Sequence, residues 1–263
     1  MKRKIFWGVF VTAFIALIAF IAIWRYDISR RGISDMDASI TVPSYIEKQQ
    51  ILRIAAVLPL TGPAAQIGTW QKNGIELALT HINSELSKDH KTIQVEYEDS
   101  SGDSKTGVSA LQRLLALNKM IAVLSSLSNV SNAILPITSR VSLPTVLLSV
   151  SYPTITDDNP WAVRCHLGSE EEAQAMVNYL LTTNIKNFSL AYVNDDFGVG
   201  AAQSLKEFAI SNKLQISIME PYEKTATDLR VLASKLIRDQ PRAIYVVGYV
   251  KSSVLLIKQL REL

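Results

Sequence analysis

The sequence predicts an α/β protein with two successive lobes, each a parallel sheet covered by helices. Two observations lead to this fold class. From residue 52 onward, short β-branched runs alternate with amphipathic stretches, which is the pattern of repeated βα units. A loop rich in Pro and Asp that ends at residue 160 interrupts this alternation once, and the alternation then starts again. With 48% apolar residues in 263, the chain is able to bury two modest cores.

The first lobe is predicted at residues 52–160. Its opening strand leads into Thr61-Gly62-Pro63, a turn sequence, and then into a helix whose apolar residues recur at helical spacing. Further strands and helices follow in the same alternation. The expected strands are 52–58, 93–97, 121–124 and 145–148; the helices carry Ile75, Leu79, Ile82 and Leu86, then Val108, Leu111 and Leu115, and then residues 129–141.

The second lobe is predicted at residues 161–263. Residues 161–166 are expected to form a crossover from the first lobe, after which helices and strands alternate again. The expected strands are 188–193, 215–219 and 243–247, and the helices are 170–183 and those that begin at Gly198, at Asp228 and after the last strand. A doubly wound sheet of three strands is small for this class, so we expect that the second lobe is incomplete in this fragment.

The N-terminal segment predicts a single membrane helix. Residues 5–24 carry no charge, and as a helix they would span roughly 30 Å, the hydrocarbon thickness of a bilayer. A cleaved signal peptide is the alternative, because Lys2, Arg3 and Lys4 form a basic start. The apolar region of a signal peptide is usually shorter, however, and Ala22-Ile23-Trp24 offers no small-x-small cleavage site. We therefore expect an uncleaved signal anchor at residues 1–24.

The charge distribution predicts where the rest of the chain lies. Cations before the apolar segment favour a cytoplasmic N-terminus, which indicates a single-pass protein of the inner (cytoplasmic) membrane with an extracytoplasmic, periplasmic domain. Polar, aperiodic residues at 25–51 predict a linker. Without the three N-terminal cations, the 27 Lys and Arg fall to 24, which equals the 24 Asp and Glu. The body of the protein is therefore neutral, and no nucleic-acid partner is expected.

No motif in the sequence predicts catalysis, a cofactor or a metal. Gly198-Val-Gly200 follows a strand as in dinucleotide-binding turns, but Gln203 stands at the third glycine position. Asp157-Asp158 and Asp195-Asp196 lie in predicted turns, where Asp commonly caps backbone amides, so we interpret them as caps rather than metal ligands. The single cysteine, Cys165, cannot form an intrachain disulfide and is expected to be a small buried apolar residue.

Small polar residues follow the third and fourth predicted strands. Ser128-Asn129 opens a helix, and Ser149-Val150-Ser151 comes directly after a strand. In open α/β sheets ligands bind at the carboxyl edge of the strands, where helix N-termini offer unpaired N–H groups to anions. These residues could hold a carboxylate, or they could be ordinary caps and turn residues. The pattern alone leaves both interpretations open.

Four ordered segments of residues 52–263 resemble the branched-chain amino-acid binding proteins among the type I periplasmic binding proteins. The resemblance covers an opening strand with its turn and first helix, an acidic turn, the segment from the fourth strand to a crossover, and a turn of the second lobe. The residues are Leu58-Pro-Leu-Thr-Gly-Pro-Ala-Ala-Gln-Ile-Gly68 with Asn73-Gly74 and His81-Ile-Asn83, then Glu98-Asp99-Ser100 with Asp103, then Pro144 to Pro153 with Asn159-Pro160-Trp161 and Arg164, and finally Asn194-Asp195-Asp196-Phe197-Gly198.

The resemblance implies a set of ligand-binding residues. By comparison with the family, a ligand α-carboxylate is expected at Ser128, Ser149 and Ser151, and side chains from both lobes are expected to close over the ligand. These closing positions are Ile67, Phe197 and Tyr249. Ile67 replaces a tyrosine that is common in the family, and Phe197 lacks a hydroxyl, so the resemblance implies a more apolar pocket.

The resemblance also implies a function. The fold is that of a two-lobe binding protein that closes by a hinge around a small ligand, an amino acid or related organic acid, without chemistry and without a cofactor. The expected role is ABC-type import with a membrane permease as partner. The alternative is the ligand-sensing domain of a membrane receptor of the kinase, cyclase or chemotaxis type, and an enzyme on a similar scaffold is a third interpretation.

Overall fold

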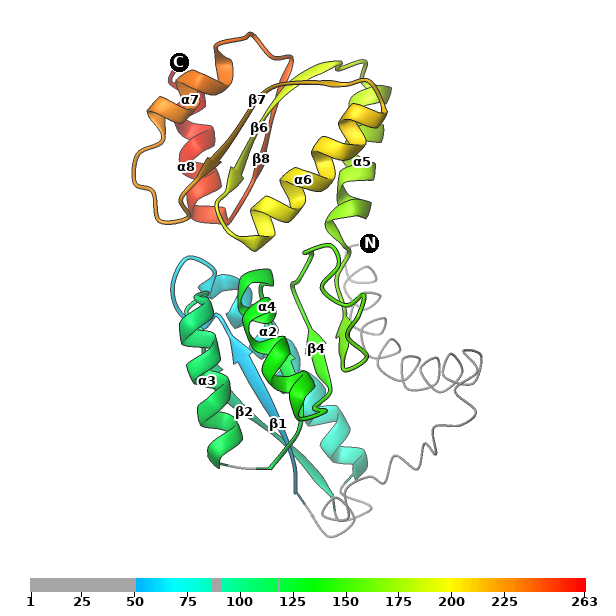
Figure 1. Ribbon diagram of the computed structural model, residues 1–263. Helices are drawn as coiled ribbons and strands as arrows, with labels where there is room; N and C mark the ends of the chain where they lie inside the picture. The colour runs from blue at the N-terminus through cyan, green and yellow to red at the C-terminus, as the bar shows by residue number, and fades with distance from the viewer. Residues whose placement is uncertain (1–50, 87–90, 118) are drawn as a thin grey trace, which may run out of the picture. The chain divides into compact units, whose positions relative to one another are not determined.

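The computed structural model describes residues 51–86, 91–117 and 119–263, which form two α/β lobes in succession (Figure 1). The first lobe contains a parallel sheet with the strand order β2-β1-β3-β4-β5. Its elements are β1 (Ile51–Leu58), α2 (Ala65–Leu86), β2 (Thr92–Asp99), α3 (Ser104–Leu117), β3 (Met120–Ser125), α4 (Ser128–Arg140), β4 (Thr145–Leu147) and β5 (Ala162–Arg164). The predicted βα alternation of this lobe is confirmed.

One element of the first sheet differs from the expectation. Residues 161–166 were expected to form only a crossover, but Ala162–Arg164 forms β5, which pairs in parallel with β4. Thr145 N donates to Trp161 O at 2.7 Å and Cys165 N donates to Leu147 O at 2.9 Å, so hydrogen bonds bracket the new strand on both sides. The first sheet therefore has five strands instead of four and reaches past residue 160. Cys165, just beyond this strand, is exposed and not buried as expected.

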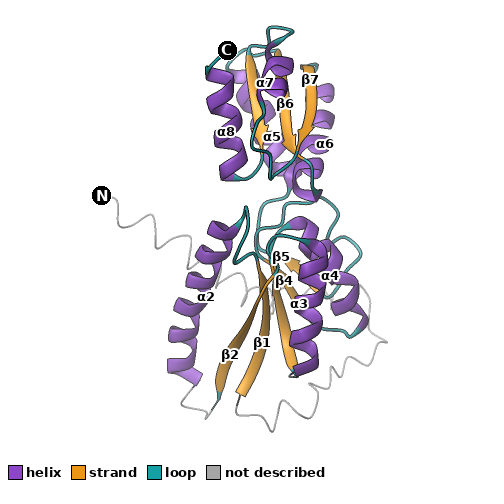
Figure 2. Ribbon diagram, turned by 90° about the vertical axis from the view of Figure 1, so that its left-hand side faces the viewer, coloured by secondary structure: helices purple, strands orange, loops and turns teal. Residues whose placement is uncertain are grey.

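Helices cover the two faces of the first sheet unequally. Figure 2 shows α2 on one face and α3 with α4 on the other. Within α3, Gly107, Ala110, Leu111 and Leu114 are buried, whereas within α2 only Gly68 is buried. The predicted apolar stripe of α2 is half-buried along its whole length. The main core of this lobe thus lies between the sheet and the pair α3 and α4.

The second lobe repeats the same architecture on a smaller sheet. Its strands are parallel in the order β7-β6-β8. Helices α5 and α6 pack against each other, as do α7 and α8, and Phe188, Leu190 and Leu205 are fully buried in its core. The elements are α5 (Ser169–Thr182), β6 (Asn187–Val193), α6 (Asp196–Ser211), β7 (Gln215–Tyr222), α7 (Arg230–Ile237), β8 (Ala243–Val247) and α8 (Val250–Arg261).

In each lobe, a glycine lets the helix that follows the first strand in chain order approach the end of that strand. A Cβ on Gly68 in α2 would lie 2.2 Å from the carbonyl oxygen of Pro59, just after β1. A Cβ on Gly198 in α6 would lie 1.9 Å from the carbonyl oxygen of Val193, the last residue of β6. No real Cβ atom tolerates such distances. The two lobes therefore share one structural device, which brings a helix N-terminus close to the carboxyl end of the sheet.

The two lobes are in contact. One continuous apolar cluster includes Val57 and Val130 of the first lobe and Val193 and Tyr249 of the second. A backbone hydrogen bond from Ser169 N to Ser151 O at 2.8 Å crosses between the lobes, and so do two hydrogen bonds donated by side chains. Asn132 Nδ2 donates to Asp196 Oδ2 at 2.7 Å, and Lys224 Nζ donates to the carbonyl oxygen of Gly102 at 2.9 Å.

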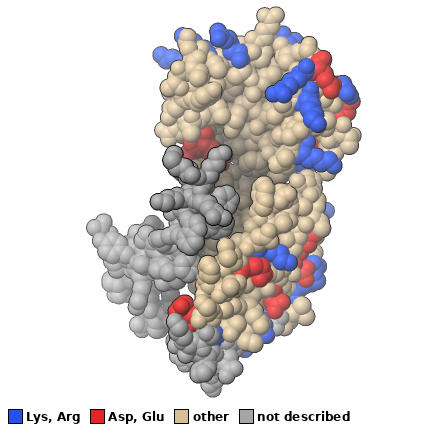
Figure 3. All heavy atoms as spheres, turned by 180° about the vertical axis from the view of Figure 1, so that it is seen from behind, with Lys and Arg blue, Asp and Glu red and all other residues tan. Residues whose placement is uncertain are grey.

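The predicted membrane helix at residues 5–24 lies outside the described residues. Within residues 51–86, 91–117 and 119–263, the structure contains no helix that is both long and apolar enough to cross a membrane. Figure 3 shows charged side chains of both signs interspersed on one face, with wide uncharged areas between them. This distribution agrees with the neutral composition of the body of the chain.

Candidate ligand-binding site

Two buried serine hydroxyls mark the carboxyl edge of the first sheet. Ser126 directly follows β3 and Ser151 follows β4, with exposed fractions of 0% and 3%. Neither hydroxyl oxygen has a hydrogen-bond partner among the residues that the structure describes. A buried polar group without a partner costs about 1–3 kcal/mol, and such groups are rare enough in native proteins to require an explanation. Ser126 and Ser151 therefore hold hydrogen-bonding capacity that the described part of the chain does not use.

The other two predicted serines link segments of this edge. Ser128 Oγ accepts a hydrogen bond from Tyr152 N at 3.3 Å, which connects α4 to the segment after β4. Ser149 Oγ accepts a hydrogen bond from Gln71 Nε2 at 2.8 Å, which connects the same segment to α2. Each of these hydroxyls can still donate its own proton. The structure thus brings all three predicted serines to one edge but gives them different roles.

Helix α4 begins at the same edge without a side-chain cap. Its N-cap residue is Leu127, whose side chain has no polar atom and whose φ is 70°, a left-handed backbone conformation that a bulky residue rarely adopts. Leu127 is buried, and its packing enforces the strained backbone. Because no side chain caps the helix, its first amides and its dipole favour an anion at this position.

Ser126 is not among the residues predicted from the sequence. The third strand was predicted to end at residue 124, and Ser128, at the start of the following helix, was predicted instead. The signal was the doublet Ser125-Ser126, because β3 ends at Ser125. Ser125 Oγ forms a buried hydrogen bond with Ser131 Oγ at 2.7 Å, which leaves Ser126 as the hydroxyl of the doublet without a described partner.

The edge of the second lobe is centred on Asp195. Tyr249 OH donates to Asp195 Oδ2 at 2.9 Å, and Gly198 N donates to Asp195 Oδ1 at 3.2 Å. The rings of Phe197 and Tyr249 lie 5.9 Å apart between centroids, at an angle of 49°. Burial raises the pKa of Tyr249, and the adjacent Asp195 carboxylate raises it further, so the phenol stays protonated and remains a donor. The polar groups of this edge are therefore satisfied within the protein.

Asp195 caps α6, as the turn position predicted. Its side chain is 8% exposed, and burial raises its pKa above the ordinary value of 3.8 despite the hydrogen bonds that it accepts. Among the residues that the structure describes, no three His, Cys, Asp or Glu side chains gather closely enough to hold a metal ion.

Ile67, Phe197 and Tyr249 share one apolar cluster. Tyr249 is a buried member of the cluster that joins the two lobes, and Ile67 and Phe197 pack against it from α2 and α6. The phenol of Tyr249 is already bonded to Asp195, so this cluster presents mainly hydrocarbon and ring surface. All three residues thus belong to or pack against one large cluster that includes both lobes, and within it the rings of Phe197 and Tyr249 are in contact.

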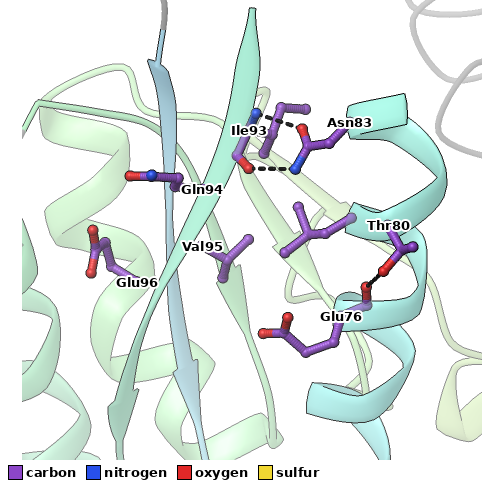
Figure 4. A pocket seen from close by; sticks show the side chains of 8 residues that line it. Glu76, Thr80, Asn83, Ile93, Gln94, Val95 and Glu96 are labelled. Carbon is purple, nitrogen blue, oxygen red and sulfur yellow. Dashed lines mark hydrogen bonds between the residues drawn. The ribbon is translucent and has the colours of Figure 1, made fainter. Parts of the chain in front are cut away.

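A separate cavity of about 430 Å³ lies between α2 and β2 (Figure 4). None of the predicted ligand-binding residues lines it. Asn83 closes one end, because its side chain donates to Ile93 O at 2.9 Å and accepts from Ile93 N at 2.8 Å. This reciprocal pair fixes α2 to an outer strand of the sheet. We place the candidate site at the carboxyl edge and not in this cavity, because the edge combines unpartnered hydroxyls with an uncapped helix start.

Comparison with known proteins identifies the family of the chain. Residues 51–263 match the family model described as periplasmic binding protein. The chain is similar to the Leu/Ile/Val-binding protein BraC3 of Rhizobium johnstonii, with 25% identity over 215 residues that cover 81% of this chain and 58% of the relative.

Two solved structures share the fold. One is the branched-chain amino acid transporter substrate-binding protein LivJ of Streptococcus pneumoniae in complex with isoleucine, with a TM-score of 0.73, 23% identity and coverage of 81% of this chain and 61% of that chain. The other is an ABC-transporter solute-binding protein of Rhodopseudomonas palustris in complex with 3,4-dihydroxybenzoic acid, with a TM-score of 0.71, 17% identity and coverage of 81% and 59%. The chain thus spans about three fifths of the length of these proteins. Because the family model matches residues 51–263, across both lobes, the chain belongs to the periplasmic binding protein family.

Proposed function

We propose that this chain captures a small carboxylate-bearing ligand between its two lobes, as the extracytoplasmic solute-binding part of an ABC-type importer. The observation that carries the proposal is the pair of buried, unpartnered hydroxyls of Ser126 and Ser151 beside the uncapped start of α4. Hydroxyl donors and free helix amides match the oxygen atoms of a carboxylate. Ser149 and Ser128 complete this edge with hydroxyl protons that they can still donate.

The ligand is proposed to be an amino acid or a related organic acid with an apolar body. Ile67, Phe197 and Tyr249 supply an apolar wall, and the phenol of Tyr249 is bonded to Asp195. Two structural neighbours hold isoleucine and 3,4-dihydroxybenzoic acid, which both combine a carboxylate with a hydrocarbon body. The shared chemistry of these two ligands defines the class that we propose to test.

The proposed mechanism is closure of the lobes around the ligand without a chemical step. The first lobe would bind the carboxylate, and the second would cover the hydrocarbon body with Phe197 and Tyr249. A ligand that contacts both lobes binds the closed state better than the open state and shifts the population toward it. The closed form would then be recognised by a membrane permease.

We further propose that residues 1–24 anchor the protein in the cytoplasmic membrane as a single helix. The proposal rests on the uncharged run of residues 5–24 and the cations that precede it. The alternative of a receptor sensing domain predicts a second run of about twenty apolar residues after the binding domain. Extending the gene sequence beyond the codon for Leu263 distinguishes the two roles.

Isothermal titration of the full chain in detergent micelles tests the binding proposal. The probes are L-leucine, L-isoleucine and 3,4-dihydroxybenzoate, and L-isoleucine amide serves as a matched ligand without a carboxylate. We expect saturable binding of at least one carboxylate probe, no binding of the amide, and recovery of the ligand unchanged by mass spectrometry. Equal affinity for L-isoleucine and its amide would refute carboxylate recognition, and conversion of a probe would refute binding without chemistry.

A further inference from the structure

Lys224 extends from the second lobe to the backbone of the first. It follows β7, and its Nζ atom donates to the carbonyl oxygen of Gly102 at 2.9 Å. Gly102 lies between β2 and α3 with a φ of 69°, a conformation that favours glycine. The side chain of Lys224 is 27% exposed, so this charged hydrogen bond is partly shielded from water. A charged, partly shielded bond is stronger than an exposed one between neutral groups.

The ammonium group of Lys224 lies between one acceptor from each lobe. Its Nζ atom is 3.9 Å from Asp195 Oδ2, in the same lobe as Lys224 itself. This ion pair can persist when the lobes separate, whereas the hydrogen bond to Gly102 O exists only while they are together. Tyr249 OH and Gly198 N hold the Asp195 carboxylate in place. Asp195 thus orients the side chain of Lys224. The hydrogen bond from Lys224 to Gly102 O forms only when the two lobes are together.

The acceptor of Lys224 is connected to the candidate site. The carbonyl oxygen of Gly102 also accepts a hydrogen bond from Asn129 Nδ2 at 3.1 Å. Asn129 lies in the first turn of α4, next to Ser128, and its Oδ1 atom is buried without a partner among the described residues. The closing contact and the proposed carboxylate contact therefore meet at the same helix turn.

We propose that Lys224 is a positioning residue that fastens the two lobes in the closed state, with the hydrogen bond between Asn132 and Asp196 as a second fastening. The inference deepens the proposed capture function and rests on it for its biological meaning. The contact between the lobes through Lys224 is itself present in the protein without ligand. Removing a charged hydrogen bond that is present in only one of two states is expected to lower the ratio of closed to open molecules roughly tenfold or more.

Distances between spin labels in the ligand-free full chain, in detergent micelles, test this inference. Labels are attached through Lys105→Cys in α3 and Lys251→Cys in α8, both exposed positions, in a Cys165→Ser background. We expect a short-distance population in the parent, a shift toward longer distances with Lys224→Met, and recovery of the short distances with Lys224→Arg, because arginine keeps the charge and the donors. No ligand is present, so the result does not depend on whether the titrations detect binding.

The matched control is Lys235→Met, which removes a lysine of the second lobe whose described ion pair, with Glu220 at 3.3 Å, lies within that lobe. It should leave the distance distribution unchanged. Asn132→Ala removes the other side-chain hydrogen bond between the lobes and should shift distances in the same direction as Lys224→Met. It tests the inference independently if Lys224→Met folds poorly. Unchanged distances in both variants, or an equal shift in the Lys235→Met control, would overturn the inference.

Discussion

The carboxyl edges of the two lobes differ in how their polar groups are satisfied. On the first edge, the hydroxyls of Ser126 and Ser151 are buried without described partners. On the second, Tyr249 and Gly198 both donate to the buried carboxylate of Asp195. A group that lacks a partner lowers stability until a ligand provides one, whereas a satisfied network is rigid without ligand. Under the proposed function, the first lobe would bind the ligand and the second would cover it.

The largest expected effect tests what the two edges have in common. Gly68→Ala and Gly198→Ala each place a Cβ within 2.2 Å of a backbone oxygen, which must move. We expect both variants to lose about 3 kcal/mol or more in the free energy of unfolding, measured by urea denaturation. Gly74→Ala, at a half-buried glycine further along α2, is the control. A small loss at only one of the two positions would show that the lobes do not share this packing device.

Tyr249→Phe tests the satisfied edge. The substitution removes a hydrogen bond to the buried Asp195 carboxylate and keeps the ring that packs on Phe197. We expect the free energy of unfolding to fall by about 1.5–3 kcal/mol, the usual range for a hydrogen bond to a charged group. Tyr179→Phe, at a tyrosine that is 60% exposed, is the control and should have little effect. A Tyr249→Phe variant as stable as the parent would mean that this edge is not held by its polar network.

Ser126→Ala and Ser151→Ala test the unsatisfied edge. Here the expected change in the free energy of unfolding has the opposite sign to that of Tyr249→Phe. Each removes a buried hydroxyl that has no described partner, so the ligand-free protein should gain up to about 1 kcal/mol of stability. Ligand affinity for the carboxylate probe that binds should fall roughly tenfold, because a hydrogen bond to a charged group is lost. Ser189→Ala is the control, since its buried hydroxyl donates to Leu236 O in the second lobe and its loss should only destabilise. Loss of stability in both Ser126→Ala and Ser151→Ala would contradict the proposed difference between the two edges.

The sequence predicted the repeating elements well because their periodicity is local. Every predicted strand and helix of residues 52–263 has a counterpart in the structure, apart from small shifts at the ends. The strand β5 was missed because three residues are too few to show alternation, and only pairing with β4 defines it. Strand ends are the least certain feature of a pattern. The third strand was predicted to end at residue 124, whereas β3 ends at Ser125, so Ser126 was not recognised as the residue that directly follows it.

The candidate site was less predictable than the fold because its contacts join distant residues. Ile67, Phe197 and Tyr249, which the resemblance grouped, belong to or pack against one apolar cluster, and their role at a ligand site stays a prediction. The link from Lys224 to Gly102, by contrast, spans 122 positions and involves a backbone oxygen, which has no signature in the sequence. Whether a serine hydroxyl is engaged or unpartnered likewise depends on tertiary packing. Composition and spacing therefore located the edge but not the state of its polar groups.

The smallest expected effect concerns two acids, Asp99 of the first lobe and Asp195 of the second. Burial alone would raise the pKa of Asp99, but hydrogen bonds from Thr61, Ser101 and Leu60 together lower it below the ordinary 3.8. Burial raises the pKa of Asp195 above the same value. Asp99 thus contributes stability above pH 3.8 that is lost as pH falls through its lowered pKa. For Asp195, stability is greatest near and below 3.8 and falls as pH rises through its raised pKa.

Urea unfolding between about pH 3 and pH 7 separates these two behaviours when the parent is compared with Asp99→Asn and Asp195→Asn. The stability difference between the parent and Asp99→Asn should shrink as pH falls, because the parent loses a favourable charge. The stability of the parent relative to Asp195→Asn should increase as pH falls, because protonation removes the buried charge of Asp195. Slopes of the same sign for both variants would mean that the acids of the two edges do not differ in environment. Slopes of opposite sign would show that the two edges differ in the environment of their carboxylates as well as in that of their hydroxyls.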